Sequence, residues 1–162
     1  DAERIGIRVY IPSGALCGID ALKAVSCGRI DSVTLTTRKP PKGLEGAPYI
    51  KSAGIDLNDI KEETVIFDGD ADKAIEGFPQ NVNVAATLSI AGIGAKKTRV
   101  RIITSPGYTR NTHEVEITGS FGRINTRTEN VPSQTNPRTS ELAILSAIAT
   151  LEGLARNVKI GT

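Results

Sequence analysis

Hydrophobic residues recur at every second position, or run together between turn residues, in several short stretches that predict strands. Five of these stretches are expected to form a sheet: 29–40, 64–69, 98–104, 113–119 and 122–131. The last two meet at the turn Gly-Ser-Phe-Gly, which predicts a β-hairpin. The runs "IRVYI" (7–11) and "VKIGT" (158–162) predict two further short strands.

Helical patterns lie between and after these strands, at 18–26, 71–77, 82–92 and 139–154. Asp70 is expected to cap the second helix, and a Thr-Ser pair ahead of an acid opens the last, which is apolar around most of its circumference. The stretch 82–92 fits a buried strand or a buried helix. Its length, its alanines and its terminal glycine favour a helix that opens at Asn81. Together the elements predict an α+β fold, a mixed sheet with helices packed on one face.

Composition places the chain among ordinary globular domains. Its 162 residues are about one domain long, with 39% hydrophobic and 23% charged residues. The longest apolar runs fall well short of the roughly 20 residues of a membrane span, so no membrane association is expected. A net charge of +2 and an aromatic content of 4% argue against a nucleic-acid partner.

The two cysteines indicate a reducing compartment. Cys17 and Cys27 stand on either side of the helix predicted at 18–26, roughly 15 Å apart at about 1.5 Å per residue, beyond the roughly 7 Å that a disulfide spans. We therefore expect free thiols, as in cytoplasmic proteins. The opening stretch 1–15 has no secretory apolar segment and resembles an internal start.

The single histidine, His113, lies in "RNTHEVEI" (110–117) where a polar turn enters a strand. A lone histidine is more often structural than functional. Acyl transfer is disfavoured because Ser13 lacks a nucleophile-elbow pattern, and no metal site is expected because one histidine and two separated cysteines supply too few ligands. The dinucleotide fingerprint is absent as well, since "GIGAKK" has Lys97 where the third glycine belongs.

Small and amide residues gather at three corners of the chain: "PSGA" (12–15), "PQNVN" (79–83) and "RNTH" (110–113). Each has a structural explanation, because Gly14 suits a turn, Asn81 a helix cap and Asn111 an Asx turn. All three corners nevertheless expose polar groups where the chain changes direction, which is where α/β architectures collect ligand contacts.

Five blocks of sequence, taken in order, resemble the L-aspartate dehydrogenase family. They are "YIPSGALCGIDALKA", "VTLTTRKPPKGL", "FPQNVNVAATLSIAGIG", "RNTHEVEITGSFGRI" and "ENVPSQTNPRTSELAILSAIATL". The resemblance implies an N-terminal Rossmann domain followed by a mixed-sheet domain like that of homoserine dehydrogenase and dihydrodipicolinate reductase, usually in a homodimer. This chain matches only the second part. Residues 1–13 are then the end of the Rossmann domain, and residues 14–162 the substrate-binding, catalytic and dimerisation domain.

The resemblance also implies a reaction, the oxidation of L-aspartate to iminoaspartate with NAD or NADP as cofactor. Residues Gly14, Ala15, Asn81 and Asn83 match segments that line the nicotinamide end of the cofactor pocket. Without the Gly-rich loop, the chain alone is expected to be inactive. A module that kept the fold and lost the chemistry is the alternative.

Substrate contacts are expected from a second group of residues. His113 matches the family's active-site histidine, as a base or as a ligand of a substrate carboxylate, and Asn111 and Ser13 are expected to hold the substrate. Arg38 and Lys39 end a predicted strand and are candidates for carboxylate recognition, or else two solvated charges ahead of a diproline.

Overall fold

Five strands form one mixed sheet in the computed structural model, which describes residues 2–79, 83–136, 139–158, 160 and 161. The strands are β1 (Ile30–Lys39), β2 (Thr64–Asp70), β3 (Thr98–Thr104), β4 (Asn111–Gly119) and β5 (Gly122–Asn130). Their order is β2-β3-β1-β4-β5, and only β1 and β3 run parallel. The expected mixed sheet and hairpin are confirmed.

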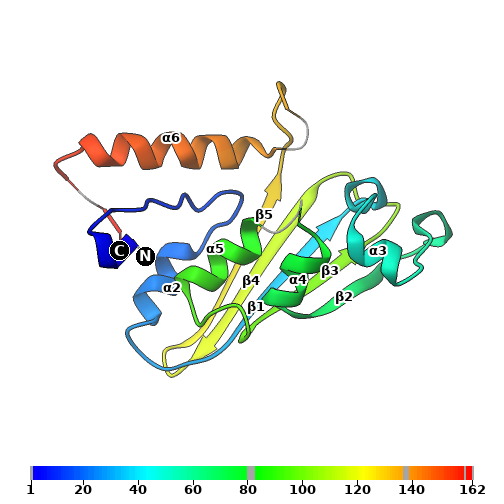
Figure 1. Cartoon of the computed structure of the whole chain (residues 1–162), viewed down its shortest axis with the longest axis horizontal. Helices are drawn as coiled ribbons and strands as arrows, with labels where there is room; N and C mark the ends of the chain where they lie inside the picture. The colour runs from blue at the N-terminus through cyan, green and yellow to red at the C-terminus, as the bar shows by residue number, and fades with distance from the viewer. Residues whose placement is uncertain (1, 80–82, 137–138, 159, 162) are drawn as a thin grey trace.

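Helices cover one face of this sheet, as the α+β prediction requires (Figure 1). They are α2 (Ile19–Val25), α4 (Ala71–Gly77) and α5 (Asn83–Ala91). The segment between β1 and β2 holds η1 (Pro41–Leu44), α3 (Pro48–Ser52) and η2 (Leu57–Asp59). The longest helix, α6 (Glu141–Ala155), lies apart from the sheet, beside the N-terminal segment that begins with α1 (Ala2–Ile5) (Figure 1). No helix among the described residues is long and apolar enough to cross a membrane.

The core forms between the covered face of the sheet and these helices. Val33 and Leu35 of β1 and Val115 and Ile117 of β4 are almost fully buried, and Leu88 of α5 packs into the same cluster. Burying one such side chain stabilises the fold by roughly 1.5–3 kcal/mol. The alternation of these apolar residues therefore decides which face of each strand turns inward.

The inward positions of three neighbouring strands change from apolar to polar at the same level of the sheet. On β1 the inward series continues from Leu35 to polar positions, and on β4 the residues before Val115 are polar too. The strand register aligns these polar positions: Thr37 with His113, His113 with Thr128, and Asn111 with Asn130. One end of the covered face is thus polar although it is largely buried.

The loop between the N-terminal segment and α2 is tied to this polar end. Thr128 Oγ1 donates to the carbonyl oxygen of Ala15 at 3.0 Å, and Asn130 Nδ2 donates to the same oxygen at 3.3 Å. Thr126, two residues earlier on β5, donates through Oγ1 to the carbonyl of Cys17 at 3.1 Å. Because residues two apart on a strand share a face, one edge strand holds the loop at two points.

A second tie joins the same loop to α6. The backbone N–H of Gly14 donates to Ser146 Oγ at 3.1 Å. Ser140 caps α6, its Oγ accepting from the Ala143 N–H at 3.2 Å, which confirms the polar start expected for this helix. The loop is therefore fixed between β5 and α6.

The strand expected at 7–11 is wrong. These residues have no regular structure, and the hydrophobic ones are at least half exposed, for example Val9 at 64%. A strand requires a neighbouring ladder, and none of the five strands in the described part of the chain pairs with this run. At the C-terminus, Val158, Ile160 and Gly161 are likewise not in a strand, and Lys159 and Thr162 lie outside the described residues. Cys17 and Cys27 are free, as expected.

Gly18 gives a test of how closely the loop packs on β5. It has φ of +89°, and a Cβ there would lie 2.8 Å from Thr126 Cγ2. Gly46 has a similar φ of +79° and open space around its Cβ position. We expect Gly46→Ala to cost about 1 kcal/mol of unfolding free energy and Gly18→Ala at least about 2 kcal/mol, because only the second adds a clash. Urea unfolding of both variants measures the difference. Equal losses would show that the loop does not press against β5.

Candidate active site

A cavity of about 480 Å³ opens at the polar end of the sheet, a volume within the range of small-molecule sites. It lies among the 11–15 loop, the ends of β1, β4 and β5, helix α5 and the start of α6. Its lining includes seven of the residues singled out from the sequence: Ser13, Gly14, Ala15, Lys39, Asn83, Asn111 and His113. The three corners of the chain thus meet around one cavity. Asn81 lies outside the described residues.

His113 is held in the wall of this cavity by its neighbour across the sheet. The imidazole is 5% exposed, and its Nδ1 lies 3.0 Å from Thr37 Oγ1, directly opposite on β1. Burial, and after it the positive charge of Lys39, lower the pKa of His113 to about 4. The ring is therefore neutral near pH 7. With Nδ1 occupied by Thr37, Nε2 is the ring nitrogen left for a ligand.

Lys39 brings a positive charge into the same cavity. It ends β1, one position beyond the Arg38–Thr112 pair, and is 7% exposed. Its backbone carbonyl accepts a hydrogen bond of 2.7 Å from Thr104 Oγ1 on β3, which fixes the end of the strand. Burial lowers the pKa of Lys39 to about 8. At neutral pH most of the molecules still carry the ammonium.

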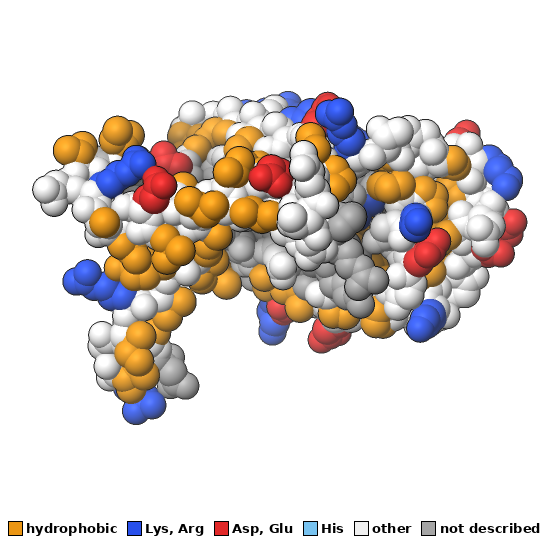
Figure 2. Space-filling model, turned by 90° about the horizontal axis from the view of Figure 1, so that it is seen from above, with side chains coloured by type: hydrophobic (Ala, Val, Ile, Leu, Met, Phe, Trp, Pro, Cys, Tyr) orange, Lys and Arg blue, Asp and Glu red, His pale blue; other side chains and the backbone are white. Residues whose placement is uncertain are grey.

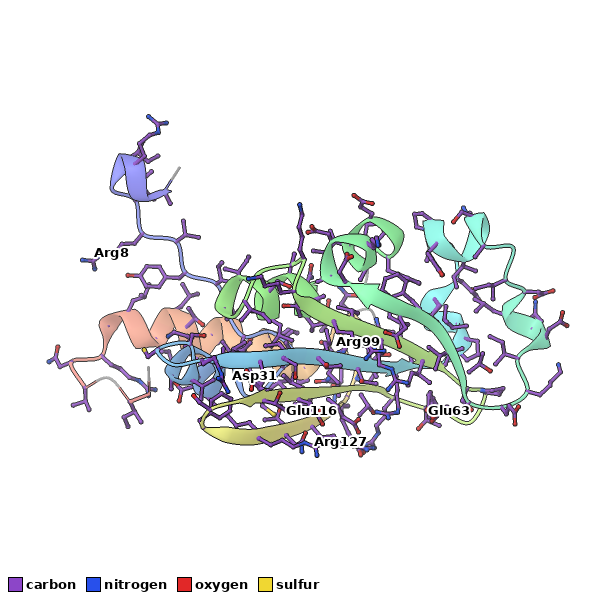
Figure 3. All side chains as sticks on the ribbon, turned by 90° about the horizontal axis from the view of Figure 1, so that it is seen from below. Arg8, Asp31, Glu63, Arg99, Glu116 and Arg127 are labelled. Atoms are coloured by element: carbon purple, nitrogen blue, oxygen red, sulfur yellow. The ribbon has the colours of Figure 1, made fainter. Side chains whose placement is uncertain are left out.

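Arg38 points the other way. Alternate residues of a strand face opposite sides, so Arg38 and Lys39 cannot share a site. Arg38 Nη1 forms an ion pair of 2.6 Å with Glu114 Oε2 and lines a different hollow on the uncovered face. Figure 3 shows Glu116 and Arg127 on that side of the sheet, away from α4 and α5. The position of Arg38 does not support the expectation that it binds a substrate carboxylate, so Arg38 is not part of the proposed site.

The uncovered face carries arginines and acids that pair with one another, with threonine and asparagine side chains among them. Arg127 Nη1 lies 2.8 Å from Glu114 Oε1, and Arg99 Nε lies 2.7 Å from Asp68 Oδ1. These exposed pairs are worth little individually. Glu114 and Glu116 of β4 both line the hollow on this face.

Several residues of the site were not singled out from the sequence, among them Thr37 and Asn130. Thr37 positions His113, and Asn130, 3% exposed, lines the cavity opposite Asn111. The position of Asn130 could have been predicted from the hairpin, because residues paired outward from its turn place residue 130 beside residue 111. Thr37 had no such local signal, since its pairing with His113 joins strands distant in the sequence.

Open space at Gly14 leaves room in the cavity wall for a flat ring such as the nicotinamide that the family resemblance implies. Gly14 has φ of +67°, and a Cβ built there would meet nothing within 4 Å, so a flat ring has room beside its backbone. Asn83 and Asn130 supply amide groups to the same wall. Among the described residues no group of three or more His, Cys, Asp or Glu side chains is arranged to hold a metal ion.

The pKa of His113 predicts how stability depends on pH. The unfolded imidazole takes up a proton near pH 6.5, but the folded one only near pH 4, so the unfolded chain binds more protons between these values. The free energy of unfolding therefore falls as pH falls through this window, by roughly 3 kcal/mol in total. His113→Gln should lose that part of the decline. Urea unfolding at about pH 7.5 and about pH 4.5 compares the two proteins, and parallel declines would contradict the prediction.

Comparisons with known proteins identify the family to which the chain belongs. The family model described as "Aspartate dehydrogenase, C-terminal" matches residues 20–154. The chain is 53% identical over 161 residues to the L-aspartate dehydrogenase of Methanosarcina barkeri (strain Fusaro / DSM 804), and 55% identical over 161 residues to that of Methanococcoides burtonii. Each alignment covers 99% of this chain and 59% of the relative.

A solved structure extends the comparison to the fold. The crystal structure of aspartate dehydrogenase from Thermotoga maritima matches with a TM-score of 0.75 at 32% sequence identity, over 96% of this chain and 57% of that one. The chain thus spans less than two thirds of the length of these relatives. Since the family model covers most of the chain, this protein belongs to the aspartate dehydrogenase C-terminal family.

Proposed function

We propose that the chain is the substrate-binding and catalytic part of an NAD(P)-dependent L-aspartate dehydrogenase. In this proposal residues 1–13 end a nucleotide-binding domain and residues 14–162 form the substrate and dimerisation domain. The observation that carries the proposal is the convergence of the 13–15 loop, Asn83 and the 111–113 corner on one cavity. The relatives named L-aspartate dehydrogenase support the choice of substrate.

Oxidation of an amino acid removes a hydride from Cα and a proton from the ammonium group. A nicotinamide nucleotide bound beside Gly14, Ala15 and Asn83 would supply the hydride acceptor. The residues of this chain hold the substrate in place, since Ser13 and Asn111 offer hydrogen bonds from two sides of the cavity. Gly14, Ala15 and Asn83 lie where the nicotinamide end of the cofactor would be bound, and we extend this role to Asn81.

His113 is proposed to receive the substrate proton. Its ring is neutral at pH 7, so Nε2 is able to accept a proton, while Thr37 keeps the ring oriented through Nδ1. A base with a pKa near 4 is weak. The negative charge that L-aspartate brings into the cavity opposes the effect of Lys39, and so raises the basicity of the ring when substrate is bound. The product is iminoaspartate, which either proceeds toward quinolinate or hydrolyses to oxaloacetate and ammonia.

The role of His113 is tested in the full-length protein, because this chain holds no Gly-rich nucleotide loop. We expect His113→Ala to lower kcat for aspartate-dependent NADH formation by roughly 10²- to 10⁴-fold, since it removes the proposed base. Cofactor affinity, measured by fluorescence titration, should stay nearly unchanged. Normal turnover in the variant would return His113 to a structural role.

The exposed apolar surface supports two further proposals about partners. Hydrophobic side chains gather over α6 and the N-terminal segment (Figure 2), and Leu145, Leu151 and Val9 are each more than half exposed. Such surfaces usually mark contacts with another domain or subunit. We propose that this surface contacts the nucleotide-binding domain and that the full-length protein is a homodimer. We also propose a cytoplasmic location, which the free cysteines Cys17 and Cys27 support.

Sedimentation equilibrium of the full-length protein tests the dimer. The expected mass is twice that of one chain at micromolar concentration, because obligate interfaces persist well below that range. A single-chain mass under these conditions would contradict the homodimer and leave the proposed reaction standing.

A further inference from the structure

The side-chain amide of Asn130, at the end of β5, has hydrogen-bond partners on only one of its two sides. Nδ2 donates to the carbonyl oxygen of Ala15 at 3.3 Å and to Thr128 Oγ1 at 3.4 Å. Oδ1 has no partner in the part of the chain that the structure describes, and almost no accessible surface through which water could reach it. Turning the amide over would place Oδ1 against the Ala15 carbonyl, where it has no donor either.

This arrangement makes Asn130 an unfavourable residue for stability. The side chain is 3% exposed, and a buried acceptor without a donor costs free energy comparable to a lost hydrogen bond. Leucine has the same branched arrangement of heavy atoms and would leave no polar atom unpaired. Residues that lower stability in this way are typical of functional sites. The role of the amide therefore lies in the groups that Nδ2 holds.

These groups connect two sides of the cavity. The single hydroxyl hydrogen of Thr128 donates to the Ala15 carbonyl at 3.0 Å, and the His113 carbonyl lies 3.4 Å from the same oxygen as a second acceptor. Asn130 Nδ2 reaches both the Thr128 hydroxyl and the Ala15 carbonyl. Because Ala15 belongs to the 13–15 loop and His113 to β4, this small network fixes the separation of the loop from His113.

Strand β5 is the more rigid of the two elements that hold the loop. It pairs with β4 along its whole length, Gly122–Asn130. Helix α6 holds the Gly14 N–H through Ser146, but none of its residues, all of which the structure describes, is buried, and it lies apart from the sheet (Figure 1). The hydrogen bonds from β5 to Ala15 therefore decide where the loop lies relative to His113.

We propose that Asn130 is a positioning residue, which holds the 13–15 loop at the distance from His113 that hydride transfer requires. The inference rests on the proposed function, in which Gly14 and Ala15 lie beside the nicotinamide and His113 receives the substrate proton. Asn130 acts through Ala15 and Thr128 and not by contact with the reacting atoms. Its effect is expected to be large, since a displacement of about 1 Å lowers a rate by roughly 100-fold.

The decisive variant is Asn130→Leu in the full-length protein. We expect kcat for the L-aspartate-dependent reduction of the nicotinamide nucleotide to fall roughly 30- to 100-fold, because the loop is no longer held in place. KM for L-aspartate and the affinity for the nucleotide should change by no more than about threefold, since no ligand contact is removed. The urea concentration at the midpoint of unfolding should stay the same or rise, because the variant removes an unpaired acceptor.

A deuterium isotope effect separates misplacement from a loss of folded protein. Deuterium at Cα of L-aspartate slows only the hydride step. If the loop is misplaced, that step limits turnover, so in Asn130→Leu the isotope effect on kcat should equal that on kcat/KM. A smaller effect on kcat than on kcat/KM in this variant would show that another step limits turnover, and would overturn the inference.

Thr126→Val is the matched control. Thr126 lies on the same strand, donates through Oγ1 to the Cys17 carbonyl at 3.1 Å, and is absent from the cavity lining. The variant loses a hydrogen bond of the same kind between β5 and the chain beyond the loop. Its midpoint of urea unfolding should therefore fall, while kcat stays within about twofold of the wild-type value.

Thr128→Val breaks the same network from its other side and serves as the second variant should Asn130→Leu not fold. It should lower kcat by a similar factor, and the double variant should lose little more, because both substitutions remove one network. Wild-type kcat in a folded Asn130→Leu or in Thr128→Val, or an equal fall of kcat in Thr126→Val, would refute the positioning role. Absence of L-aspartate-dependent reduction in the wild type would instead refute the proposed function.

Discussion

The position of β4 between β1 and β5 is the constraint on which the site depends. One antiparallel register places Thr37 beside His113, and the other places Thr128 beside the same residue. The first register is secured by the apolar half of the strands, where Leu35 and Val115 pair in the core. In the second, Ile117 in the core pairs with the partly buried Ile124. Packing in the core therefore positions the polar ends of the strands, although the core residues are not part of the site. A buried imidazole is tolerated there because Thr37 satisfies one of its nitrogens.

The two faces of the sheet use charge in different ways. On the uncovered face many charged side chains are in contact with water and form ion pairs, as Arg127 and Glu114 do. Water weakens these interactions, so each pair contributes little. On the covered face the side chain of Lys39 is largely removed from water, and its charge, second to burial, lowers the pKa of His113. Burial turns a small number of polar groups into a reactive environment, which is typical of active sites.

Much of this arrangement could be predicted from local patterns, and the exceptions have physical causes. The hairpin needed only turn chemistry, and the helix found at Asn83–Ala91 needed only the length, the alanines and the terminal glycine of its stretch. The alternation of side chains along β1 also indicates which of its last two residues faces the core. Val33 and Leu35 face the core, so Lys39 faces inward as well and Arg38 does not. The strand expected at 7–11 was wrong because an apolar run becomes a strand only beside a partner. The pairing of Thr37 with His113 is non-local, and no short-range pattern indicates it.

The double fixation of the 13–15 loop has a consequence for motion. Gly14 is bound to α6 and Ala15 to β5, while residues 7–11 just before them are exposed and irregular. The exposed run is thus joined to a rim that two other elements hold in place. Because both fixed points lie outside the loop, the rim of the cavity keeps its shape whatever surface packs against the run before it.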